Sequence, residues 1–114
     1  MNKKYPNLKP GSVKSLQKYV SDKIIERGFE DETVQESLLL LVEEVGELVK
    51  AARKATGMNV SKYSKEYDMG QEIADVINLI FAVGIKAGID IEKEFIKKNN
   101  EVDKRFYKRM NKIV

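Results

Sequence analysis

Hydrophobic residues recur along the chain at the three- and four-residue spacing that is typical of amphipathic helices. The first such segment begins at Ser12, which we expect to be the N-cap, and ends near Arg27, just before Gly28. One face of this segment is apolar and carries Val13, Leu16, Val20 and Ile24. The pattern therefore predicts a first helix over residues 12–27.

A second helix is predicted from Thr33 to about Thr56. Thr33 and Glu36 have the spacing of a capping box, and Gly57 follows the last turn. Most apolar residues of this segment share one broad face, which we interpret as its core stripe: Leu38, Leu41, Val42, Val45, Leu48, Val49 and Ala52. Three glutamates lie together on the opposite side: Glu43, Glu44 and Glu47.

The third and fourth helices are predicted over about residues 69–87 and from Asp90 to roughly Met110. Gly88 ends the third helix, and Asp90 is placed to cap the fourth, which has Glu92 and Glu94 in its first turn. The third segment is apolar around nearly its whole circumference, which indicates burial in a bundle or at a subunit interface.

No segment shows the alternating pattern of a strand, so the fold class that we predict is an all-α four-helix bundle. Residues 1–10 contain Pro6 and Pro10 and are predicted to be an extended lead-in to a single helical domain over 11–114. Residues 57–68, with Tyr63 and Tyr67, are polar and are predicted to be a loop or an irregular short helix, and we expect Phe29 and Phe95 in the core.

The composition excludes several classes of site. The 114 residues include no cysteine and no histidine, which rules out disulfides, thiolate or Ser-His catalysis and cysteine-ligated zinc. The net charge of +3 gives no strong reason to expect a nucleic-acid partner. Without a signal peptide or an apolar run of membrane-spanning length, we expect a cytoplasmic protein.

The three glutamates of the second helix are spaced so that their carboxylates can converge. Glu43, Glu44 and Glu47 have i,i+3 and i,i+4 relations, at which like charges repel unless a cation offsets them. A solvated polar face is the simpler interpretation of such a group. However, Leu40 and Ala51 lie on the same side as the glutamates, so that side is not uniformly polar.

The third helix adds two carboxylates in an apolar segment. Glu72 and Asp75 lie one turn apart on one face, where an unpaired buried carboxylate would cost several kcal/mol. Because histidine is absent, lysine, arginine or a metal ion must offset these charges. Four or five carboxylates on two facing helices suit Mg²⁺, with Mn²⁺ as a substitute. Such an ion can bind substrate phosphates and activate a water molecule, whose proton a neighbouring glutamate accepts.

The paired motif resembles the MazG-like all-α nucleoside triphosphate pyrophosphohydrolases, whose signature is Glu-Glu-x-x-Glu followed by Glu-x-x-Asp. It is formed here by Leu-Val-Glu-Glu-Val-Gly-Glu-Leu-Val at 41–49 and Gln-Glu-Ile-Ala-Asp-Val-Ile at 71–77. The resemblance covers roughly residues 12–106. It implies Mg²⁺-dependent cleavage of the α–β phosphoanhydride of an NTP or dNTP, giving the monophosphate and pyrophosphate. It also implies metal ligation by Glu44, Glu47, Glu72 and Asp75, with Glu43 as an outer ligand or as a group that orients the water.

The resemblance also bears on substrate binding and assembly. In the family, the last helix supplies a lysine, an asparagine and an arginine to the nucleotide. Lys98 and Arg105 match two of these positions, while Val102 replaces the asparagine. Asn78, on the apolar third helix, has either a substrate-binding or a structural role. We expect a homo-oligomer, either a dimer or a tetramer. A non-catalytic metal-binding helical module is the alternative function.

Overall fold

The computed structural model describes the backbone of residues 10–57 and 68–113, with the side chains of 10–57 and 68–105. Within these ranges the chain is all-helical and contains no strand, as predicted. The four helices are α1 (Ser12–Glu26), α2 (Val34–Ala55), α3 (Met69–Ala87) and α4 (Ile91–Ile113). Residues 1–9 of the expected lead-in and the loop tyrosines Tyr63 and Tyr67 lie outside the described residues.

Local capping chemistry sets most of the helix ends as predicted. Thr33 and Glu36 form the expected capping box at the start of α2. Asp90 Oδ1 accepts a hydrogen bond from the Lys93 amide at the start of α4, at 3.1 Å. Gly88 adopts a left-handed conformation with φ of 70° directly after α3, where a residue with a Cβ would be strained.

The start of α1 differs from the prediction. The N-cap is Gly11 rather than Ser12, and no side chain of the N-cap satisfies the free amides of the first turn. Instead, Glu92 of α4 reaches across and accepts hydrogen bonds from the backbone amides of Gly11, Val13 and Lys14, at 3.1–3.2 Å. A carboxylate at a helix N-terminus is favoured by both the free amides and the helix dipole. The cap of α1 is therefore supplied by a residue distant in the sequence.

Replacing Glu92 by alanine should lower the free energy of unfolding by about 1–2 kcal/mol, since charge-assisted bonds to a helix N-terminus are lost. Glu94 provides a matched control, because it lies in the same first turn of α4 and is exposed. The Glu94→Ala change should alter stability by no more than about 0.5 kcal/mol. Urea denaturation of both variants measures the difference, and equal effects would show that the cap contributes little.

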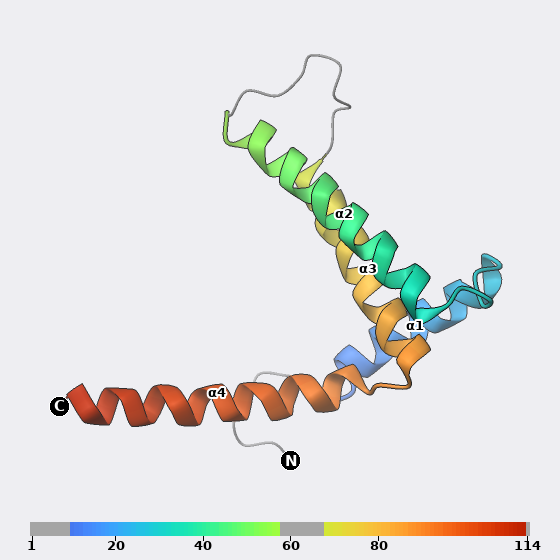
Figure 1. Ribbon diagram of the computed structural model, residues 1–114. Coiled ribbons are helices and arrows are strands. Elements are labelled where there is room, and N and C mark those ends of the chain that lie inside the picture. The colour runs from blue at the N-terminus through green and yellow to red at the C-terminus, as the bar shows by residue number, and fades with distance from the viewer. Residues whose placement is uncertain (1–9, 58–67, 114) are drawn as a thin grey trace.

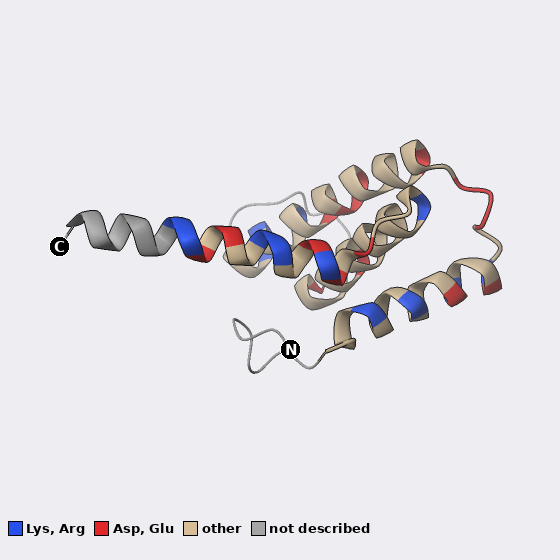
Figure 2. Cartoon of the chain, turned by 90° about the horizontal axis from the view of Figure 1, so that it is seen from below, with Lys and Arg blue, Asp and Glu red and all other residues tan. Residues whose placement is uncertain are grey.

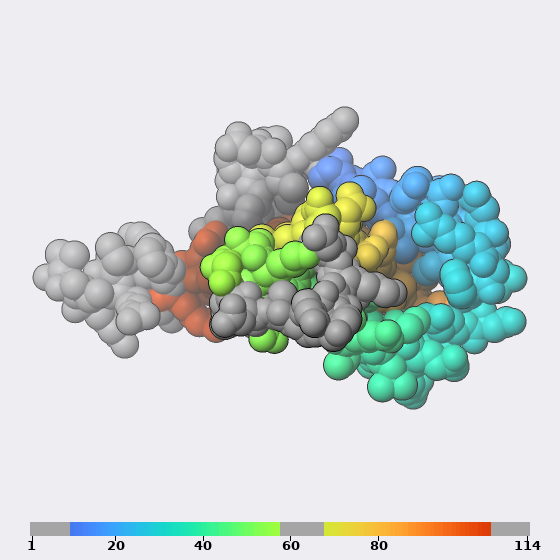
Figure 3. Space-filling model, turned by 90° about the horizontal axis from the view of Figure 1, so that it is seen from above, coloured from blue at the N-terminus to red at the C-terminus, as the bar shows by residue number. Residues whose placement is uncertain are grey.

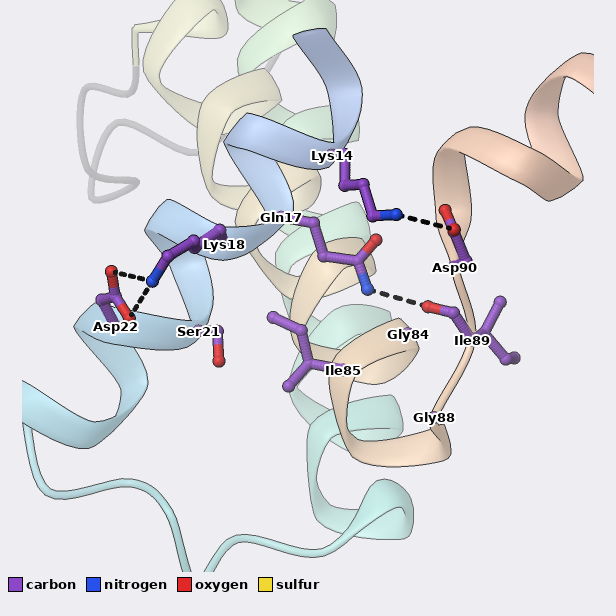
Figure 4. Close-up of a pocket in the computed structure, with 10 residues that line it drawn as sticks. All are labelled: Lys14, Gln17, Lys18, Ser21, Asp22, Gly84, Ile85, Gly88, Ile89 and Asp90. Atoms are coloured by element: carbon purple, nitrogen blue, oxygen red, sulfur yellow. Dashed lines mark hydrogen bonds and ion pairs between the residues drawn. The ribbon is translucent and has the colours of Figure 1, made fainter. Parts of the chain in front are cut away.

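Further contacts join α1 to the turn between α3 and α4 (Figure 4). Gln17 donates from Nε2 to the Ile89 carbonyl at 2.8 Å and accepts at Oε1 from the Ile91 amide at 3.1 Å. Lys14 Nζ lies 3.6 Å from Asp90 Oδ2. These bonds satisfy backbone groups of the turn and fix the direction in which α4 leaves it.

The helices are arranged as an antiparallel pair with two attached helices (Figure 1). α2 and α3 lie side by side along much of their lengths, α1 packs against the C-terminal part of α3, and α4 packs against α1 while projecting from the pair. Among the described helices of one chain, only α2 and α3 therefore run alongside each other along much of their lengths. The all-α class is confirmed, whereas the four-helix bundle stays a prediction.

The predicted core stripe of α2 is only partly buried, since Leu41, Leu48 and Ala52 are half-buried and the rest of the stripe faces outward. Four residues of that stripe have relative exposures of 42–70%: Leu38, Val42, Val45 and Val49. The described hydrophobic core is small and consists of Val20, Ala51, Phe81 and Ala82. Phe29 and Phe95, which we expected in the core, are 54% and 50% exposed. The four stripe residues of α2 are exposed because the side of α2 that carries Glu44 and Ala51 faces α3.

Candidate metal centre

Three carboxylates from two helices converge between α2 and α3. Glu44 comes from α2, and Glu72 and Asp75 come from α3. One carboxylate oxygen of each lies within 4.8 Å of those of the other two. Glu72 is buried, Glu44 is half-buried and Asp75 is exposed, so the group is open to solvent on one side. Figure 2 shows acidic positions on the paired helices and several basic positions on the projecting α4.

The pairing of α2 with α3 explains how this group forms. Ala51 lies two turns after Glu44 and is 2% exposed, so a small side chain occupies the close contact between the helices. On α3, Glu72 and Asp75 are one turn apart, which directs both carboxylates toward the same region beside α2. The i,i+3 and i,i+4 spacings that predicted convergence in the sequence therefore act through this contact.

The electrostatics of the group disfavour negative charge on Glu44. Its pKa is raised above its ordinary value, first by burial and then by the negative charge of Asp75. A hydrogen bond with Glu72, and the charges of Glu72 and Glu43, act in the same direction. A bound cation would reverse this cost, because it favours the ionised form of each carboxylate.

Two carboxylate oxygens near the group have no hydrogen-bond partner among the described residues. They are Glu47 Oε2, one turn after Glu44, and Glu72 Oε2, and both atoms are buried. Buried oxygens normally accept at least one hydrogen bond. Because the donor set consists only of hard carboxylate oxygens with unused lone pairs, it fits Mg²⁺ or Mn²⁺.

The raised pKa of Glu44 predicts how the stability of the metal-free protein changes with pH and with the Glu44→Gln substitution. Folding binds the Glu44 proton more tightly, so this stabilisation is complete below the unfolded value of about 4.5 and is lost as the pH rises through the folded pKa. In EDTA at neutral pH, Glu44→Gln should therefore melt at a higher temperature than the wild type. Adding Mg²⁺ should raise the wild-type melting temperature more than that of the variant. A lower melting temperature for Glu44→Gln in EDTA would contradict the prediction.

The structure does not bring all the predicted site residues together. Glu43 is exposed and lies outside the three-carboxylate group, although its charge raises the pKa of Glu44. Lys98 and Arg105 lie on α4, which packs against α1 and not along α2 or α3. The Arg105 guanidinium instead lies 3.8 Å from Glu101 of its own helix.

A cavity of about 290 Å³ lies among α1, α2 and α3, and its lining does not include the clustered carboxylates themselves. Its wall includes Leu40, one turn before Glu44, and Asn78, one turn after Asp75, so it lies one helical turn from the group along both helices. The remaining lining residues are Tyr19, Val20, Lys23, Ile24, Arg27, Phe29, Glu32, Leu79 and Ala82. Figure 3 shows a hollow between α1 and the start of α2, with α3 behind it. Of these lining residues, Asn78 is the only one that the sequence indicates as a candidate for substrate binding.

A second groove, of about 450 Å³, is more open and lies between α1 and the turn before α4 (Figure 4). Its charged side chains are engaged with one another, since Lys18 pairs with Asp22 at 3.2 Å and Lys14 with Asp90 at 3.6 Å. This groove is distant along the helices from Glu44 and Glu72. We therefore place the candidate site at the carboxylates and the smaller cavity.

Comparisons with protein-family models, curated proteins and solved structures give no significant match to this chain. Among the described helices, none has both the length and the apolar character needed to cross a membrane. The residues of the site are therefore the basis on which a function is assigned.

Proposed function

We propose that the chain is a Mg²⁺-dependent nucleoside triphosphate pyrophosphohydrolase, which cleaves an NTP or dNTP to the monophosphate and pyrophosphate. One observation carries the proposal: α2 turns Glu44 toward the carboxylates of α3 while leaving four residues of its apolar stripe exposed. An amphipathic helix ordinarily buries the apolar side. Gathering Glu44, Glu72 and Asp75 between helices is costly without a cation, and the two unpartnered oxygens of Glu47 and Glu72 support a metal there.

The carboxylates have distinct roles in this proposal. Glu44, Glu72 and Asp75 hold the ion, which when bound supplies positive charge to the phosphate oxygens and acidifies water. Glu47 lies outside that group and has a buried unpartnered oxygen, so it is suited to complete the ligand set or to accept the proton of the attacking water. Glu43 is exposed and acts through its charge on Glu44.

In this proposal, the nearby cavity binds the nucleoside part of the substrate. Its wall combines apolar and aromatic side chains with a few polar groups, as small-molecule sites commonly do. The guanidinium of Arg27 lines it as well, which favours an anionic ligand, whereas Lys23, which also lines it, pairs with Glu26 at 3.0 Å. Asn78 contributes an amide next to the carboxylates, in keeping with a substrate-binding role.

The proposal includes a homo-oligomer. Leu38, Val42, Val45 and Val49 of α2 are exposed, and so are Ile73, Ile77 and Ile80 of α3, at 42–46%. Exposed apolar side chains in this number on two paired helices favour an interaction site. Gly46 also lies on the exposed side of α2 with no side chain near its Cα, so a second copy can approach the helix closely there. Pairing these faces would produce a four-helix bundle from two chains.

A second copy would also explain how Lys98 and Arg105 can reach a metal centre, although they lie away from that of their own chain. At 100° per residue, both lie on the same side of α4 as Phe95 and Val102, and all four are exposed. A partner that covers the apolar pair would receive the two cations as well. We therefore place Lys98 and Arg105 of one copy at the carboxylates of another, where they would contact the phosphates.

A turnover screen tests the proposed function directly. Purified protein is incubated with Mg²⁺ and a panel of NTPs and dNTPs, and monophosphate and pyrophosphate are quantified. Equal amounts of both products from any member support the proposal. Mg²⁺-dependent thermal stabilisation without turnover would contradict it and favour the metal-binding module.

A further inference from the structure

The cavity next to the carboxylates contains one acidic side chain, that of Glu32, whose position is unusually well fixed. Its Oε1 accepts a hydrogen bond from the Ser37 hydroxyl at 3.0 Å, and Ser37 is fully buried at 0% exposure. The Glu32 amide donates to the Phe29 carbonyl at 3.1 Å. A buried hydroxyl thus orients a carboxylate that lines the cavity.

The connection that carries Glu32 is itself anchored on α3. Lys86 Nζ donates to the carbonyls of Phe29 and Glu30, at 2.8 and 2.9 Å. These bonds hold the segment between α1 and α2 against the C-terminal part of α3. Phe29 and Glu32, which both line the cavity, are therefore placed by tertiary contacts as well as by the capping of α2.

The axial spacing along α2 between Ser37, which holds Glu32, and Glu44 of the metal centre suits a nucleotide. Ser37, which holds the Glu32 carboxylate, precedes Glu44 by seven residues of continuous helix, or about 10 Å at 1.5 Å per residue. This is roughly the separation of the base edge and the α-phosphate in an extended nucleotide. A base facing Glu32 would leave its phosphates near Glu44.

Resting on the proposed function, we propose that Glu32 selects guanine as the base of the substrate. A carboxylate only accepts hydrogen bonds, and guanine presents two adjacent donors, N1–H and the 2-amino group, on its Watson–Crick edge. Adenine and cytosine present a single amino group beside an acceptor, and uracil flanks its one donor with two carbonyl oxygens. These acceptors would oppose the oxygens of Glu32.

The rest of the cavity agrees with a purine. The side chains of Tyr19, Ile24, Phe29 and Leu79 provide apolar and aromatic surface for the faces of a ring system. Arg27 lines the same cavity as Glu32, so its positive charge reduces the repulsion of an anionic nucleotide.

Binding of nucleoside monophosphates without Mg²⁺ tests the inference independently of catalysis. Calorimetry with GMP, IMP, AMP, CMP and UMP should show GMP bound at least about tenfold more tightly than AMP, CMP or UMP, since a bidentate pair discriminates by this much or more. IMP lacks the 2-amino group and should lie between GMP and the others. Glu32→Gln should remove the preference, and Ser37→Ala should weaken it.

Glu30→Gln is the matched control, because Glu30 lies in the same connection but does not line the cavity, and this variant should keep the preference for GMP. Circular dichroism verifies that each variant is folded. Equal binding of all bases, preference for another base, or a guanine preference that survives Glu32→Gln would overturn the inference. Turnover without guanine preference would overturn it while the proposed function stands, whereas guanine preference without turnover would do the reverse.

Discussion

Glu72→Gln should reduce turnover by about a thousandfold or more while leaving the helices intact. The change removes a charge from the only buried carboxylate of the three-residue group, and loss of metal-based charge stabilisation costs several kcal/mol in the transition state. Asp75→Asn should have a similar effect, because it removes another oxygen ligand from the same group. Initial rates at saturating Mg²⁺ provide the measurement, with far-UV circular dichroism to verify folding.

The control for these variants is Glu94→Gln, an equally conservative change at an exposed glutamate in the first turn of α4. It should retain wild-type turnover. If Glu72→Gln or Asp75→Asn keeps most of the activity, the carboxylate group is not the metal centre of the reaction. Isothermal titration of Mg²⁺ into the same variants separates loss of metal binding from loss of a later step.

Mixing two inactive variants should restore activity if α4 acts on the site of another copy. The first variant is Glu72→Gln, and the second carries Lys98→Ala together with Arg105→Ala. In a random mixture of dimers, half are mixed, and one of their two sites has neither defect. The expected recovery is therefore about a quarter of wild-type activity, measured after the two proteins have exchanged subunits.

A second mixture checks the interpretation of this experiment. Glu72→Gln combined with Asp75→Asn should give no recovery, because both residues come from α3 of one chain and every site retains a defect. Analytical ultracentrifugation verifies that the variants form the same assembly as the wild type. Failure of the first mixture to recover would place Lys98 and Arg105 at the site of their own chain or away from any site.

Features encoded by neighbouring residues could be predicted from the sequence. The capping box of Thr33 and Glu36, the left-handed Gly88 and the cap by Asp90 each depend on a few consecutive residues, and each is present. The convergence of Glu44, Glu72 and Asp75 also followed from helical spacing, once two helices were assumed to face each other.

The orientation of α2 could not be predicted in the same way. The apolar stripe containing Val42 and Val49 predicts a core face, because an amphipathic helix usually packs its apolar side within its own chain. Periodicity identifies such a side but not the molecule that covers it. Here the side with Glu44 and Ala51 contacts α3. The exposed apolar residues of α2 would therefore be buried only in the homo-oligomer that we propose.

Long-range polar contacts were likewise absent from the sequence pattern. Glu92 was expected to favour the dipole of its own helix, yet its carboxylate caps α1. The role of Glu32 in the cavity depends on Ser37 and on the fold of the connection, and no local spacing indicated it. Such contacts form only when helices that are distant in the sequence pack together, and helical periodicity does not specify that packing.

The cap of α1 by Glu92 has a consequence for the order of folding. Lys14 and Glu92 are 78 residues apart, so the first turn of α1 cannot be completed until most of the chain has been synthesised and brought together. Closing so long a loop is entropically costly and slow compared with forming adjacent helices. During synthesis, the beginning of α1 therefore remains frayed while α2 and α3 pair, and one of the earliest helices becomes one of the last parts to be fixed.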